Sequence, residues 1–327
     1  MRRRDLVQLV CASALLNPTR LAAQVTSRIR RVGWVETWTL LARNDWGDIA
    51  EHLRPLGWTR GVNVHVDMHV ATTPAQLPVL AREAVAAHPD LIVANGTPAT
   101  LAVLAETRSI PVLFFEVADP VGNGIVGNMS HPGGNTTGFT TFEPSLGGKW
   151  LQLLKEIDPR VRRAAILFNP ETAHNRASPF VREFEAVAAS LMVEPILAFT
   201  QDASGIEPVL ADLAAAPGGA LLVLPDVFTF SQRRLIVDFA EQYRVPAIYG
   251  SRYMAATGGL LAYGPTMEGL HQGVASYMDR VLRGAKPGEL PVQAPTRYEL
   301  VVNLGTAKTL GLTVPPTLMA AADEVIE

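Results

Sequence analysis

The sequence contains almost no cysteine. Cys11 is the only one among 327 residues, and it lies in an N-terminal stretch with the features of an export signal. If that stretch is removed, disulfides, thiolate catalysis and cysteine-based metal sites are excluded together. Beyond it, no run approaches the ~20 continuous apolar residues that a membrane-spanning helix needs, so we expect no such helix there.

Basic charge is also scarce. The formal net charge is −3, and residues 1–23 hold four of the arginines and one aspartate, which leaves 24 basic against 30 acidic side chains. A nucleic-acid partner favours a basic surface. We therefore expect no nucleic-acid partner.

The motifs of several enzyme classes are missing. No Gly-x-Gly-x-x-Gly follows the first predicted strand, where Gly33-Trp34-Val35 stands instead, and there is no P-loop and no Gly-x-Ser-x-Gly. His65 and His69 are close in sequence, but strand geometry separates them by about 13 Å, too far to share a metal. We expect no catalytic residue, no metal and no cofactor.

The first 23 residues have the order of a signal peptide. Arg2, Arg3 and Arg4 precede an apolar stretch, Leu6 to Leu16, and small residues end it at Ala23. The pair Arg3-Arg4 also resembles a twin-arginine signal. We interpret residues 1–23 as a signal peptide and expect the protein in the periplasm, exported by either route.

The rest of the chain alternates between short apolar runs and segments of helical period. The predicted strands are Arg31–Val35, Val62–Val70, Asp90–Asn95, Ile110–Glu116, Ala164–Phe168, Val193–Phe199, Ala220–Leu224 and Ala247–Tyr249. Alternation of this kind predicts parallel sheets. Because the pattern restarts midway, we predict an α/β protein of two Rossmann-like lobes, each a parallel sheet flanked by helices, joined by a hinge of several chain crossings.

Gly/Thr-rich and Gly-Pro segments predict where the chain crosses between lobes. The first crossing is expected at residues 138–145 and the second near Gly264-Pro265. The first lobe would then comprise residues 24–140 and about 265–288. The second would comprise residues 141–264 and about 289–327.

Polar residues recur where predicted strands end. Ligands of open α/β sheets bind at the carboxyl ends of the strands, beside helix N-termini. The candidate ligand-binding residues are Trp34, Glu36, Asn95, Thr97, Asp119, Asn169, Glu171, Asn175, Asp226 and Ser251. Each of them alone is also a common helix-cap or turn residue, and Asp226 in particular fits a plain helix cap.

Segments along the whole chain resemble the corresponding segments of one protein family. They are Asp119–Gly122, Pro132–Gly138, Gly148–Leu151, Pro225-Asp226, Gly258–Leu260, Gly284–Pro287, Tyr298–Asn303 and Pro315–Leu318. With them the chain resembles ABC-transporter substrate-binding proteins of the periplasmic binding protein type I fold, in the branch that binds tryptophan, tyrosine or phenylalanine.

The resemblance implies a solute-binding protein, not an enzyme, that closes its lobes on a small molecule. It adds Thr137 at the first crossing to the candidate residues and places Thr97 at a ligand-facing helix start. We expect Asp226 to face a ligand amine, with Trp34, Phe228 or Tyr249 against the apolar part of the ligand. The segment Trp34 to Trp38 departs from the family pattern, which leaves the ligand open.

The implied partners are a small-molecule ligand and an ABC permease in the inner membrane, and we expect a monomer. Two other interpretations stay open. An enzyme on two Rossmann-like lobes, of racemase or sugar-nucleotide type, would show turnover. A ligand sensor without a transport role would have the same sequence features.

Overall fold

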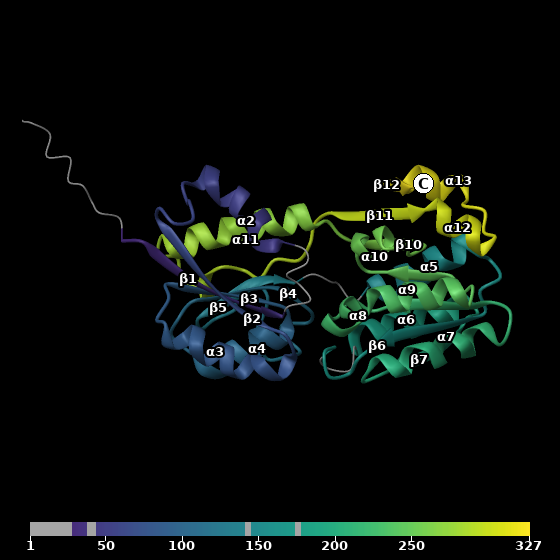
Figure 1. Cartoon of the computed structure of the whole chain (residues 1–327), viewed down its shortest axis with the longest axis horizontal. Helices are drawn as coiled ribbons and strands as arrows, with labels where there is room; N and C mark the ends of the chain where they lie inside the picture. Colours follow the sequence, from purple (N-terminus) through teal and green to yellow (C-terminus); the bar gives the residue numbers. More distant parts are fainter. Residues whose placement is uncertain (1–27, 38–43, 141–144, 174–177) are drawn as a thin grey trace, which may run out of the picture.

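The computed structural model describes residues 28–37, 44–140, 145–173 and 178–327. Two α/β lobes lie side by side, with the C-terminus on the second lobe (Figure 1). Each lobe is built on one sheet flanked by helices. This confirms the predicted fold class. The predicted signal peptide and Asn175 lie outside the described residues.

The first lobe holds a five-stranded sheet in the order β2-β1-β3-β4-β5, and all its pairs are parallel. Its strands are β1 (Arg30–Thr37), β2 (Val64–Ala71), β3 (Leu91–Asn95), β4 (Val112–Val117) and β5 (Thr136–Thr140). β5 was not predicted as a strand.

Helices cover both faces of this sheet. They are α2 (Asp45–Leu53), α3 (Leu77–Ala86), α4 (Thr97–Glu106) and α11 (Met267–Leu282). Successive side chains of β1 divide between two cores: Trp34 packs on the α2 and α11 side, and Val35 packs on the α3 and α4 side. Burial on both faces explains why these strands read as continuous apolar runs.

The second lobe holds a seven-stranded sheet in the order β12-β11-β10-β9-β8-β6-β7. Its strands are β6 (Arg163–Phe168), β7 (Glu194–Phe199), β8 (Gly219–Val223), β9 (Ala247–Tyr249), β10 (Leu261–Pro265), β11 (Tyr298–Asn303) and β12 (Glu324–Ile326). All neighbouring strands in this sheet pair in parallel except β10 and β11, which are antiparallel.

Two further cores cover the faces of the second sheet. The helices are α5 (Leu146–Ile157), α6 (Ser178–Ser190), α7 (Ile206–Ala214), α8 (Val227–Ser231), α9 (Arg233–Gln242), α10 (Arg252–Ala256), α12 (Leu304–Leu310) and α13 (Pro316–Ala321). In the part of the chain that the structure describes, no helix combines the length and apolarity needed to cross a membrane.

The chain passes between the lobes three times. It leaves β5 for α5, leaves β10 for α11, and returns to β11 (Figure 1). The last crossing comes later than expected, because Leu290 belongs to the first core and Gln293 N donates to Gly138 O at 3.0 Å. Residues 290–293 therefore lie with the first sheet, which corrects the predicted boundary near residue 289. Thr266 N donates to Arg297 O at 3.1 Å and links the second and third crossings.

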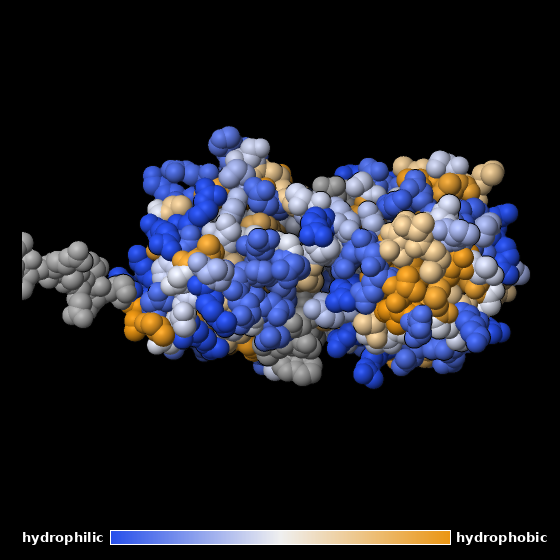
Figure 2. Space-filling view, turned by 90° about the horizontal axis from the view of Figure 1, so that it is seen from above, coloured by the Kyte–Doolittle hydropathy of each residue, from blue (hydrophilic) through white to orange (hydrophobic). Residues whose placement is uncertain are grey.

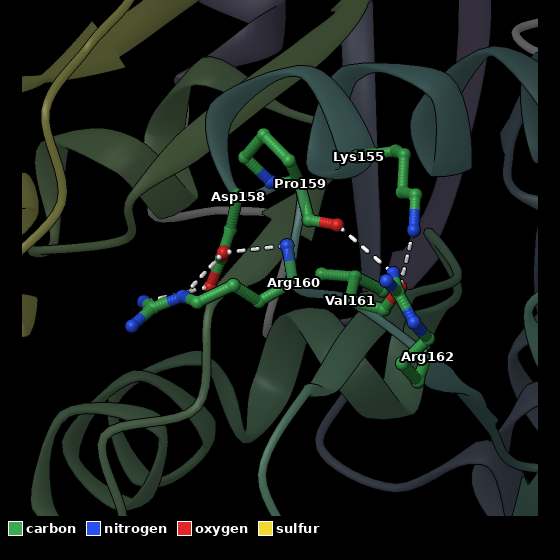
Figure 3. A network of polar contacts seen from close by, with 6 residues as sticks. All are labelled: Lys155, Asp158, Pro159, Arg160, Val161 and Arg162. Carbon is green, nitrogen blue, oxygen red and sulfur yellow. Dashed lines mark hydrogen bonds and ion pairs between the residues drawn. The ribbon is translucent and has the colours of Figure 1, made fainter.

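The loop between α5 and β6 is held by its own polar contacts (Figure 3). Asp158 accepts from Arg160 N at 3.0 Å and from Arg160 Nε at 2.9 Å, while Lys155 Nζ donates to Val161 O. Burial, and then the nearby Arg162 charge, hold the pKa of Lys155 below its usual range. The loop precedes the amino end of β6, so these contacts lie at the edge of the sheet away from the strand carboxyl ends.

Gly264 lets β10 lie against the end of β9. A Cβ atom at this position would overlap the carbonyl oxygen of Gly250. At Gly33 in β1, by contrast, a Cβ would be 3.5 Å from Ile92 Cγ1, an ordinary contact.

We therefore expect Gly264→Ala to lower the free energy of unfolding by roughly 1–3 kcal/mol, the usual effect of overpacking. Gly33→Ala, a matched strand position, should change it by less than about 1 kcal/mol. Urea unfolding followed by circular dichroism measures both. Equal effects in the two variants would contradict the close approach at Gly264.

Candidate functional site

A pocket lies between the lobes, at the carboxyl ends of strands from both sheets. From the first lobe it is lined by Asn95, Gly96 and Glu116, which end or follow β3 and β4. From the second lobe and the second crossing it is lined by Val223 to Val227, Thr229, Phe230, Tyr249, Gly250, Ser251, Met254, Pro265 and Met267. The empty space, part of it open to solvent, is about 700 Å³. Seen from above, the surface has a waist between the lobes (Figure 2).

A second pocket adjoins the first and shares Gly96, Glu116 and Asp226 with it. It adds Thr97 and Asp119 from the first lobe and Thr172 and Phe180 from the second. Both pockets are therefore lined from both lobes, and we treat them together as the interlobe site.

The walls of the site are mostly apolar, with a few acidic groups. Tyr249, Phe230 and Met254 contribute apolar surface, and Glu116 and Asp226 contribute carboxyl groups. Among the described residues that line the two pockets there is no lysine or arginine. A ligand with a cationic group and an apolar part would match this lining.

Asp226 links the start of α8 to the loop that follows β6. Its Oδ1 accepts from Thr229 N at 2.9 Å and from Thr172 Oγ1 at 3.0 Å, and its Oδ2 accepts from Asn169 N at 3.2 Å. It is the N-cap of α8 in a capping box with Thr229. Burial raises its pKa to about 6, although these hydrogen bonds act in the opposite direction. Asp226 is thus a helix cap, and it also lines both pockets.

Asn95 ends β3 in front of a buried polar cluster in the first lobe. Its Nδ2 donates to Asp45 Oδ2 at 3.1 Å and to Glu36 Oε2 at 3.4 Å. Asp45 Oδ1 in turn lies 3.0 Å from Nε2 of His271, at the start of α11. All four side chains are buried. The cluster connects the site wall to the helix that follows the second crossing.

The end of β4 has an unusual backbone. Glu116 has φ 56° and Asp119 has φ 43°, in the left-handed region that non-glycine residues rarely adopt. The turn after it is held by Gly122 N, which donates to Asp119 Oδ1 at 2.9 Å, and by Asn123 Nδ2, which donates to Asp119 O at 2.9 Å. Such strain is most often found at functional sites. Here it lies where both pockets meet the first lobe.

The structure brings together part of the predicted site. The predicted residues that line one or both pockets are Asn95, Thr97, Asp119, Asp226, Tyr249 and Ser251. Glu36 lies behind Asn95, and Asn169 contacts Asp226 through its backbone N–H. Glu171 N donates to Asn169 Oδ1 at 2.8 Å and lines neither pocket.

Three predicted contacts need correction. Trp34 lies in the core of the first lobe, with its ring 5.5 Å from Phe115 and 5.7 Å from Trp46, because strand alternation directs it toward α2 and α11. Thr137 lies in β5, before the first crossing, where its hydroxyl donates to Leu290 O at 2.7 Å, and it lines neither pocket. Phe228 packs against the second-lobe core and lines neither pocket.

Sequence reasoning missed Glu116 and Phe230. Glu116 ends the predicted fourth strand, so the strand-end rule would have found it had it been applied to the last strand residue. Phe230 follows the helix cap Asp226 by four residues, and helical period brings that position back to the same face.

Comparison with known proteins places the chain in a family. The model of the ABC transporter substrate binding protein family matches residues 42–326. A tyrosine-binding protein of Clostridioides difficile (strain R20291) is 24% identical over 263 residues, 80% of this chain and 74% of that protein.

Solved structures show the same fold. A conserved domain protein from Vibrio cholerae O1 biovar El Tor superposes with a TM-score of 0.84 at 25% identity, over 91% of this chain and 100% of that chain. An ABC domain in complex with L-Trp from Streptococcus pneumoniae gives a TM-score of 0.83 at 23% identity, over 91% and 99%. The fold is that of type I periplasmic binding proteins. Since the family model matches most of its length, this chain belongs to the ABC transporter substrate binding protein family.

Proposed function

We propose that this protein is the solute-binding component of an ABC importer and captures an amino acid, aromatic or related, between its lobes. Proteins of this family bind small molecules, act outside the cytoplasm and work with a membrane permease; they are not enzymes. The finer proposal for this chain is import of its ligand by hinge closure, with an inner-membrane permease as partner and a monomeric binding protein.

The observation that carries this proposal is a pocket lined from both lobes. Asn95 and Glu116 come from the first lobe, and Asp226 and Tyr249 from the second. A ligand that touches both lobes stabilises the closed arrangement over the open one by the contacts it gains there. In this proposal the hinge is formed where the chain passes between the lobes, from β5 to α5, from β10 to α11 and back to β11.

The lining supports a zwitterion with an apolar side chain. The carboxylates of Asp226 and Glu116 favour an ammonium group, and Tyr249 and Phe230 offer flat apolar surface. Helix α4 begins at Thr97 beside Gly96, and its N–H groups suit a ligand carboxylate. The names of two relatives, a tyrosine-binding protein and an L-Trp complex, are consistent with this class of ligand.

We expect ligand binding to compact the protein without changing its secondary structure. Calorimetry with L-tryptophan, L-tyrosine and L-phenylalanine, against L-glutamate and D-glucose as controls, first identifies a ligand. Small-angle scattering at saturating ligand should then show a smaller radius of gyration, with an unchanged far-UV dichroism spectrum. An identical radius would contradict hinge closure.

The second prediction concerns Asp226 and pH. If ionised Asp226 pairs with the ligand ammonium, affinity requires the deprotonated carboxyl, whose pKa is raised to about 6 in the empty protein. Lowering the pH from 7 to 5 should then weaken binding about tenfold, because most of the carboxyl is protonated at pH 5. Titration calorimetry across this pH range measures how the affinity changes with pH.

Asp226→Asn should weaken binding roughly 30-fold or more at pH 7, the usual cost of removing one partner of a desolvated charge pair, and should remove the pH slope. Asp202→Asn is the matched control, since Asp202 also caps a helical turn, through Ser204 N at 2.9 Å, but is exposed and lines neither pocket. If the affinity of the wild-type protein for its ligand does not change with pH, Asp226 serves only as a helix cap.

The proposal also places the protein in the periplasm, after cleavage of the predicted signal peptide, residues 1–23. N-terminal sequencing of protein recovered from the cell envelope should begin between Gln24 and Ser27. Replacing Arg3 and Arg4 by lysine should abolish export if the twin-arginine route is used and leave it intact if the general secretory route is used. Recovery of intact Met1 from the envelope would contradict the signal peptide.

A further inference from the structure

The side-chain amide of Asn95 has a fixed orientation. Its Nδ2 donates to two carboxylates, Asp45 at 3.1 Å and Glu36 at 3.4 Å. The flipped amide would place its oxygen against these two carboxylate oxygens, which offer no proton when ionised. The NH₂ group must therefore stay turned toward the cluster, and Oδ1 must stay turned away from it.

The oxygen of this amide has no hydrogen-bond partner among the residues that the structure describes. Asn95 is 1% exposed, and its Oδ1 is buried without a donor. A buried acceptor without a donor is disfavoured, and such atoms in native proteins usually have a purpose. Asn95 is also part of the pocket wall at the end of β3, together with Gly96 and Glu116. The unpaired acceptor thus belongs to a residue of the interlobe site.

The groups behind the amide make this acceptor favour a cation. Two carboxylates on the Nδ2 side polarise the amide and raise the negative charge on Oδ1. The His271 ring contacts the opposite oxygen of Asp45, at 3.0 Å, and does not contact Asn95. A neutral donor such as a phenol hydroxyl gains less from this arrangement than an ammonium does.

We infer that Asn95 is a specificity-determining residue, whose Oδ1 accepts an N–H from the ligand ammonium while Asp226 approaches the same group from the other lobe. This inference rests on the proposed function and deepens it. One ammonium carries three N–H donors, so it can bond to both lobes at once. The contacts to the amine then hold the lobes together. An otherwise identical carboxylic acid that lacks the amine would stabilise the closed form poorly.

The experiment compares one ligand pair on matched variants. L-tryptophan and indole-3-propionate differ by the ammonium group alone. Titration calorimetry on the wild type should show tryptophan binding at least about 100-fold more tightly, the effect of leaving buried polar groups unpaired. Asn95→Leu keeps the approximate size and removes the acceptor, so it should weaken tryptophan binding at least about tenfold and indole-3-propionate binding less than about threefold.

Thr100→Val is the matched control. Thr100 is fully buried in α4, where its hydroxyl donates to Gly96 O at 2.8 Å, and it lines neither pocket. Removing that hydrogen bond perturbs the same pocket wall at a residue that does not line the pocket. The ratio of the affinities for tryptophan and indole-3-propionate should therefore stay unchanged. Should Asn95→Leu not fold, Glu36→Gln removes one of the charges behind the amide and should lower the ratio about threefold.

The outcomes separate the two proposals. Equal weakening of both compounds in Asn95→Leu, or in Glu36→Gln if that variant is used, would overturn the role of Asn95 and leave the amino-acid proposal standing. A wild type that binds none of L-tryptophan, L-tyrosine and L-phenylalanine would overturn the amino-acid proposal itself, and this inference with it.

Discussion

Burial of each sheet on both faces is the constraint on which the rest of the molecule depends. Four separate cores, two for each sheet, leave the strand faces covered by helices. Ligand contacts can then be made only at the strand ends, and parallel strands bring their carboxyl ends to one edge. The crossings turn those edges toward each other. The pocket therefore combines Asn95 at the end of β3 with Tyr249 at the end of β9.

Much of this architecture could be predicted because buried parallel strands have a strong pattern. The eight strands predicted as apolar runs, β1 to β4 and β6 to β9, are all present within a few residues of their expected bounds. β5 was missed because Gly138 stands at its centre, and glycine usually indicates a turn. Here glycine is needed, since a Cβ would overlap the carbonyl oxygen of Phe114. β12 has three residues, too few for any period.

The site was predicted less well than the fold, for a related reason. The strand-end rule finds residues by their place in the chain, and it found Asn95 and Ser251. It does not say to which face of the sheet a side chain points. Trp34, three residues before the end of β1, therefore falls in the core. The polar cluster behind Asn95 could not be foreseen either, because Asp45 and His271 are separated by 226 residues and meet only when α11 packs against α2.

Each lobe holds one polar group of the site at a cost in stability, for a different physical reason. In the second lobe, burial raises the pKa of Asp226 to about 6 against an ordinary value of 3.8. At neutral pH the ionised form thus lowers the stability of the empty protein, by up to about 3 kcal/mol. This loss of stability is absent below about pH 4, where the carboxyl is protonated in both the folded and the unfolded chain. It grows as the pH rises toward 6. In the first lobe, Asn95 Oδ1 has no hydrogen-bond donor in the described part of the chain. A ligand ammonium would relieve both costs, so part of the binding energy is already present in the empty protein as lost stability. Under the proposed function, a site with so few polar groups would therefore still favour a charged ligand.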